Sequence, residues 1–194
     1  MAKTEKLFSK IMMIIFLALI ILGFTIPGFI NNSGTGTVQD QVEPRLCKTD
    51  ADCYLTCDTQ PLPVLCLQNL CQQNECGDSY FSYEQEDPIA FELEVRLSEN
   101  SLNLVELANS RDLFVRFMDE NKVEMYSPKL SLNIVLDKMK MILANNCLGI
   151  NLEIYCSDQE HSLAVLINGE EATDPGLYIP NTGDEIKILY SVLG

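Results

Sequence analysis

Hydrophobic and polar positions divide the chain into three stretches, and the first is one long apolar run. Residues 11–30 contain no charged side chain, and about 20 apolar residues are the length that a helix needs to cross the hydrocarbon of a bilayer. Three lysines precede the run, and no Lys or Arg follows before Arg45. Because basic residues favour the cytoplasmic side, the pattern predicts a single transmembrane helix, an uncleaved anchor within residues 1–30 whose N-terminus is inside.

A cleaved signal peptide is the alternative, since it also combines a basic start with an apolar centre. The nearest approach to a small-x-small cleavage site is residues 23–25, and Pro27 follows two residues later. Both alternatives export the rest of the chain. The predicted location is therefore the cell membrane, with residues 11–30 in the bilayer and the C-terminal part extracytoplasmic.

The second stretch is a flexible linker and a cysteine-rich module. Residues 31–46 are rich in Gly and Thr, which is typical of a spacer, whereas residues 47–77 carry too few large apolar residues for a core of their own. The module has no C-x-x-C motif, and the only histidine, His161, is far away in sequence, so the spacing favours disulfides over zinc or redox chemistry. Three disulfides with 15 possible connectivities are expected among Cys47, Cys53, Cys57, Cys66, Cys71 and Cys76.

The third stretch, residues 78–194, alternates between apolar and polar positions. That period of two is typical of half-buried strands. Asn168-Gly169 is a strong signal for a tight turn between strands, and a polar turn over 119–122 predicts a hairpin. Strands are expected over residues 91–97, 113–117, 123–126, 152–156, 163–167 and 185–190.

One segment of the third stretch follows the period of a helix instead. Apolar residues recur at steps of three and four from Leu132 to Leu143 after a potential N-cap, which predicts an amphipathic helix over 131–145. Leu136 and Met139 are expected to face the sheet, so that Leu136→Ala should cost about 2–5 kcal/mol. Lys138 flanks this stripe and is expected to be exposed, with a cost for Lys138→Ala under about 0.5 kcal/mol. The predicted fold class is α+β, a small mixed sheet with one helix on one face.

The last two cysteines, Cys147 and Cys156, follow the predicted helix and end the next strand. A reactive thiol would need a basic neighbour or a helix N-terminus, and the sequence offers neither. We therefore expect a disulfide between them and four disulfides in all.

Two segments resemble known families. The runs V-L-I-N-G-E from Val165 and G-D-E-I-K-I from Gly183 resemble the closing half of β-grasp domains, as in sulfur carriers of the ThiS/MoaD type and in uncharacterised membrane-anchored archaeal proteins. The resemblance covers about residues 89–191 and implies a β-grasp-like domain. A single terminal glycine and an exported location count against a carrier role. The C-x-x-D-x-D-C run that begins at Cys47 is similar to small secreted cysteine-rich modules.

The net charge and the motifs of the sequence exclude several classes of function. The net charge is −15, and the part after residue 10 carries 10 basic and 27 acidic side chains, or −17. Such a surface repels nucleic acid, whose binding needs clustered Lys and Arg. No phosphate loop, zinc motif or nucleophile motif occurs, so no enzyme activity, metal or cofactor is expected. We predict a membrane-anchored extracytoplasmic binding or scaffold protein whose partner is a second exported protein or a glycan. The alternative is an extracytoplasmic thiol–disulfide or folding-assistance protein.

Overall fold

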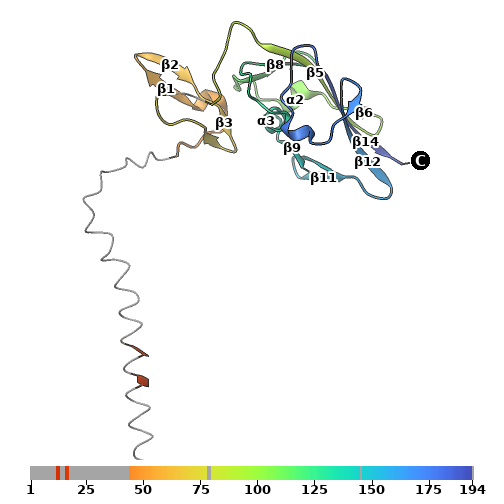
Figure 1. Ribbon diagram of the computed structural model, residues 1–194, viewed down its shortest axis with the longest axis horizontal. Helices are drawn as coiled ribbons and strands as arrows, with labels where there is room; N and C mark the ends of the chain where they lie inside the picture. Colours follow the sequence, from red (N-terminus) through yellow and green to blue (C-terminus); the bar gives the residue numbers. More distant parts are fainter. Residues whose placement is uncertain (1–11, 14–15, 18–43, 78–79, 145, 194) are drawn as a thin grey trace, which may run out of the picture. The chain divides into compact units, whose positions relative to one another are not determined.

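A computed structural model describes residues 12–13, 16–17, 44–77, 80–144 and 146–193. The chain divides into two compact units, Met1–Val42 and Glu43–Gly194. The predicted anchor over residues 11–30 lies almost wholly outside the described residues, and only four of its residues are described, all helical. Among the described residues, every strand lies in the second unit (Figure 1).

The largest element of this unit is a seven-stranded sheet in which β13, β12, β14, β5, β8 and β7 follow one another and β6 pairs with β5. The central pair, β5 and β14, is parallel, and the other pairs are antiparallel. In β5, Phe91, Leu93 and Val95 are buried and alternate with charged residues, as a strand with one covered face requires. The strands are β5 (Ile89–Leu97), β6 (Asn100–Ser101), β7 (Val115–Phe117), β8 (Lys122–Met125), β12 (His161–Ile167), β13 (Glu170–Glu171) and β14 (Glu185–Val192).

A second, three-stranded sheet has the order β11-β10-β9. Its inner face is buried and joins the core of the large sheet through Met141, Leu143, Leu148 and Ile150. The strands are β9 (Met141–Ala144), β10 (Cys147–Ile150) and β11 (Glu153–Cys156). The helical elements of this part are α2 (Leu104–Leu107), α3 (Leu132–Asp137) and the 3-10 turn η2 (Pro175–Leu177).

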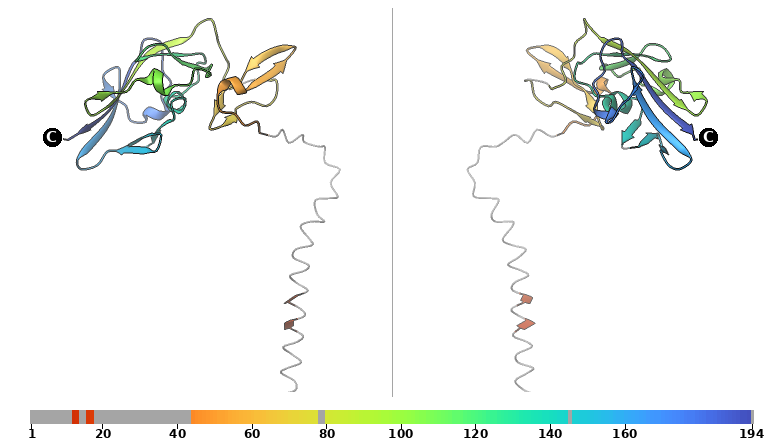
Figure 2. Two further views of the ribbon diagram at one scale, coloured as in Figure 1. Left: turned by 180° about the vertical axis from the view of Figure 1, so that it is seen from behind. Right: turned by 45° about the vertical axis from the view of Figure 1, so that its right-hand side comes forward.

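The cysteine-rich segment consists of two small hairpins, which Figure 2 shows in orange and yellow from two further sides. The first six cysteines pair in the order first with fourth, second with fifth and third with sixth, as Cys47–Cys66, Cys53–Cys71 and Cys57–Cys76. The fourth disulfide, Cys147–Cys156, joins opposite residues of β10 and β11. The elements are η1 (Asp50–Asp52), β1 (Tyr54–Cys57), β2 (Gln60–Pro63), β3 (Cys66–Leu67) and β4 (Leu70–Cys71).

The predicted strands lie within two residues of β5, β7, β8, β11, β12 and β14. The predicted turn at Asn168 and Gly169 is also present, with φ of 53° and 85°. These left-handed values belong to the tight turns that suit two-residue hairpins, and here the turn joins β12 to β13. Alternation and turn chemistry therefore located most of the sheet.

The predicted fold class is wrong. The second unit is mostly sheet, and the two α-helices of its described residues, α2 and α3, have only four and six residues, so that it is not an α+β domain with one long helix on a sheet. In the described residues no helix is long and apolar enough to cross a membrane, and the expected N-terminal transmembrane helix is not part of the observed fold.

The helix predicted over 131–145 ends early for a local reason. The chain leaves the helix after Asp137 and passes through Lys140, whose φ is 58°. It then forms β9, in which Met141 and Leu143 are buried and alternate with exposed residues. The adjacent apolar residues in Met141–Leu143 fit a period of two as well as one of 3.6, and burial against the core selects the strand.

Exposure predicts the order in which the disulfides are reduced. Exchange with an external thiol needs access to sulfur, so Cys57–Cys76, which includes the exposed Cys76, should open first under limiting dithiothreitol, and the buried Cys53–Cys71 should open last. Alkylation and peptide mass mapping at successive times would show the order. Early opening of Cys53–Cys71 would contradict it, and unreduced material should yield no free thiol.

Candidate functional site

The carboxylate of Asp50, from η1 of the cysteine-rich segment, is fully buried against the sheet domain. Its Oδ1 accepts hydrogen bonds from the backbone N–H of Cys66 at 2.8 Å and from Lys138 Nζ at 2.6 Å. Its Oδ2 accepts from the N–H groups of Leu113 and Phe114 at 2.9 and 3.1 Å. One carboxylate therefore binds β3, the segment before β7 and the residue that ends α3.

Lys138 is the cation of this cluster and is only 7% exposed. Besides Asp50, its Nζ donates to the carbonyl of Cys66 at 2.7 Å and lies 3.6 Å from Asp112 Oδ1. The expectation that Lys138 is exposed and dispensable is wrong. The side chain of Lys138 contacts the cysteine-rich segment instead of water. The predicted burial of Leu136 and Met139 in the core is confirmed.

A polar pocket of about 390 Å³ opens beside this cluster. One wall comes from the cysteine-rich segment, and the others come from the loop after α2, the end of α3, β9 and the β10–β11 turn. Apart from Cys66 and Ile142, every side chain in its lining is charged or an amide. These polar side chains are Lys48, Gln68, Asn69, Asn109, Asp112, Asp137, Lys138, Lys140 and Asn151.

Four of the lining residues have left-handed backbones, with φ between 51° and 63°: Gln68, Asn69, Lys140 and Asn151. Gln68 and Asn69 form the turn between β3 and β4, where such values are normal. Lys140 is the unusual member, because a long side chain adopts this region at a cost of about 1 kcal/mol that glycine would avoid. The β3–β4 turn, the chain after α3 and the β10–β11 turn thus bring polar side chains to the same pocket.

Two carboxyl groups of the pocket have altered acidity. Burial raises the pKa of Asp112 above its ordinary value, against the attraction of Lys138. Burial also raises the pKa of Asp137, which Lys138 and a hydrogen bond from the backbone of Gln68 oppose. A carboxylate removed from water is harder to ionise, so both groups hold protons more readily than exposed carboxyls do.

A second candidate surface is the outer face of the three-stranded sheet, hereafter the outer face. Ile142 and Ile154 lie opposite Gly149 in the strand register, and they are 64% and 73% exposed. Leu152, in the β10–β11 turn, is 98% exposed. Among the described residues of β9, β10 and β11, this face carries no charged side chain, since its other members are Ala144 and the Cys147–Cys156 disulfide.

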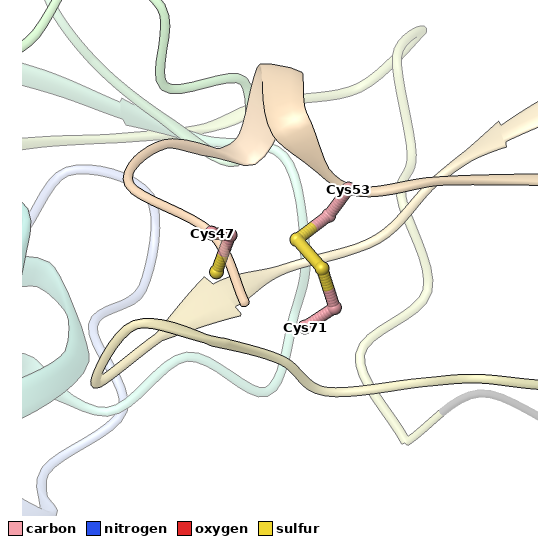
Figure 3. Close-up of side chains that lie close together, drawn as sticks. All are labelled: Cys47, Cys53 and Cys71. Carbon is pink, nitrogen blue, oxygen red and sulfur yellow. A yellow bond between two sulfur atoms is a disulfide. The ribbon is translucent and has the colours of Figure 1, made fainter. Parts of the chain in front are cut away.

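Three buried cysteines of the small module, Cys47, Cys53 and Cys71, have sulfur atoms within 4.8 Å of one another. Figure 3 shows the bond between Cys53 and Cys71 with Cys47 beside it; Cys47 is bonded to Cys66. A metal binds the thiolate form of cysteine, and sulfur in a disulfide has no thiolate to offer. In the oxidised protein this cluster is structural.

Sequence reasoning selected the eight cysteines, and the structure places six in one module and two across β10 and β11. The sequence analysis did not identify Asp50, Asp112 and Lys138 as a cluster, because no sequence motif links these three positions. His161, the only histidine of the sequence, begins β12; its ring stacks on Tyr190 and its Nδ1 lies 3.0 Å from Asp158 Oδ1.

No protein-family model, curated protein or solved structure matches the chain. The β-grasp resemblance therefore stays a prediction, and function has to be argued from these surfaces.

Replacing Lys138 tests the buried cluster. Lys138→Ala should lower the free energy of unfolding by about 3–5 kcal/mol, because it leaves the Asp50 carboxylate buried without its cation. Lys122→Ala, at an exposed position in β8, should cost under about 0.5 kcal/mol. Urea unfolding of the oxidised chain measures both, and similar small losses would mean that Lys138 does not hold the segment.

A pH series tests the state of Asp112. In Asp112→Asn the acceptor for the N–H of Asp50 is kept and the ionisable group is lost. Because the pKa of Asp112 is raised on folding, the folded state binds the extra proton, and the wild type should gain stability over the variant as pH falls through that pKa toward 3.8. Parallel stability curves between neutral pH and pH 4 would contradict this.

Proposed function

We propose that the protein is an extracytoplasmic, non-enzymatic binding or scaffold protein that docks another exported protein on the outer face. The row Ile142, Gly149 and Ile154, in which both isoleucines are exposed, carries the proposal. Burying each isoleucine would contribute about 1.5–3 kcal/mol. The four disulfides indicate an extracellular or otherwise oxidising location, where such a partner would be met.

Gly149 supports docking because the fold itself does not require a glycine there. A Cβ at this position would lie 3.7 Å from the carbonyl oxygen of Ile142 and 3.9 Å from its Cβ, which is ordinary contact. Glycine inside a strand weakens it relative to alanine, and it often marks a place where another backbone approaches closely. Because Gly149 has no side chain, a partner strand or loop could approach the backbone between Ile142 and Ile154.

The negative charge of the chain indicates which kind of partner protein would bind the outer face. Exposed acidic residues Glu153, Asp158 and Glu160 lie in and just after β11, and the whole chain carries a charge of −15. A second copy would bring the same net negative charge, whereas a protein whose apolar side chains are bordered by Lys or Arg would be complementary to it. We infer a partner of the latter kind.

Crosslinking on intact producing cells tests the docking. A photo-crosslinking amino acid at position 152 of the full-length protein should give one discrete product that weakens as salt is raised. Ile142→Asp should abolish that product, while Met118→Asp, at an exposed apolar position outside the outer face, should leave it unchanged. A product that contains only this chain, or equal losses from both variants, would contradict the proposal.

Gly149→Ala separates docking from folding. The substitution should raise the free energy of unfolding by about 0.5–1 kcal/mol, because alanine costs less entropy in a strand. The same variant should give less of the crosslinked product, because a methyl group at position 149 would keep a partner's backbone away from the strand. Thermal unfolding and crosslinking yield would be measured on one preparation, and an undiminished yield would mean that no partner approaches Gly149.

Thiol–disulfide exchange is the second candidate function, and one observation favours it, the exposure of Cys76 in the Cys57–Cys76 bond. A protein of this class would pass that disulfide to a reduced client. Opening of this bond at the rate of an ordinary exposed disulfide, with no transfer to a reduced client peptide, would leave the docking proposal as the better account.

A further inference from the structure

The charges at the polar pocket balance. The lining has three positive side chains, Lys48, Lys138 and Lys140, and two negative ones, Asp112 and Asp137. The buried Asp50 carboxylate, which pairs with Lys138, provides the third negative charge. A ligand with a net charge would upset this balance. The pocket therefore favours a neutral ligand.

Asp112 supplies an unused hydrogen-bond acceptor. The residue is 6% exposed, and its Oδ1 accepts from the N–H of Asp50 and faces Lys138. Within the described part of the chain, its Oδ2 makes no hydrogen bond. Hydrogen bonds to an ionised acceptor are stronger than those between neutral groups, so a ligand that donates an O–H to Oδ2 would gain from this contact.

The same pocket lining also contains hydrogen-bond donors. Lys138 is unavailable, because its Nζ already contacts Asp50, Cys66 and Asp112. Lys48 and Lys140 are exposed and line the same pocket. The lining also has four side-chain amides, each able to donate and accept. Hydroxyl groups likewise donate and accept at once, so a ligand with several adjacent hydroxyls would match this lining.

We propose that the pocket binds a neutral polyhydroxylated ligand, the chemical class of a sugar residue, with one hydroxyl donating to Asp112 Oδ2 and a neighbouring one accepting from Lys140. The pocket volume of about 390 Å³ is in the range of small-molecule sites. This proposal is independent of docking on the outer face, because it needs none of that face except Ile142.

The experiment uses full-length oxidised protein and a panel of probes. The neutral probes are the methyl glycosides of glucose, galactose, mannose and N-acetylglucosamine; the charged probes are glucuronate and glucosamine. Ligand-detected NMR should show binding of at least one neutral glycoside with a dissociation constant in roughly the millimolar range, tighter than either charged probe. No neutral binding, or preference for a charged probe, would overturn the proposal.

Two variants and one control locate the site. Asp112→Asn puts an N–H₂ donor where the acceptor stood and should weaken the neutral glycoside by about tenfold or more. Lys140→Gly removes the other donor while easing the left-handed backbone, so it should weaken binding with folding intact. Asp174→Asn, in a different pocket, should bind as the wild type does. Wild-type affinity in both pocket variants would refute the assignment.

Discussion

The buried ion pair between Asp50 and Lys138 is the interaction on which the rest of the structure depends. Disulfides hold the cysteine-rich segment together internally, but they all close within it or within the β10–β11 hairpin. The Asp50 carboxylate instead joins residues that are 16, 63, 64 and 88 positions away in sequence. Leu65, which belongs to the core of the sheet domain, adds an apolar contact to the same joint. Since apolar replacements of buried ion pairs are often as stable, we interpret the pair as a device for specificity: it allows one placement of the segment on the sheet.

The polar pocket follows from that joint. A desolvated cation with two carboxylates needs polar surroundings, and the turns that bring Asn69, Lys140 and Asn151 together supply them. Because one wall belongs to the disulfide-bonded segment, the pocket exists only while the segment is folded against the sheet. Oxidation of the cysteines is thus a condition for the pocket as well as for stability.

The sheet could be predicted from sequence because its information is local. Alternation in β5 and the Asn168–Gly169 turn each specify a strand or a turn within a few residues. The end of α3 could not be predicted, since the Met141–Leu143 residues fit both periods and only packing decides between them. The exposure of Lys138 was predicted wrongly for a related reason. Its place beside the apolar stripe predicts a side chain in water, but its ion-pair partner Asp50 lies 88 residues earlier in the sequence. The pocket has the same non-local origin, and no spacing of residues along the chain marks it.

Ile142 lies where the two candidate sites meet, since it belongs to the outer face and also lines the polar pocket. A protein docked on the face and a sugar residue in the pocket would both contact this side chain. Thermodynamic linkage then requires that any effect of one ligand on the affinity for the other be reciprocal. The short strand β9, with Met141 and Leu143 in the core, gives Ile142 a rigid backbone on which such an effect would act. The coupling would therefore arise from contact at one side chain and would need no change of fold.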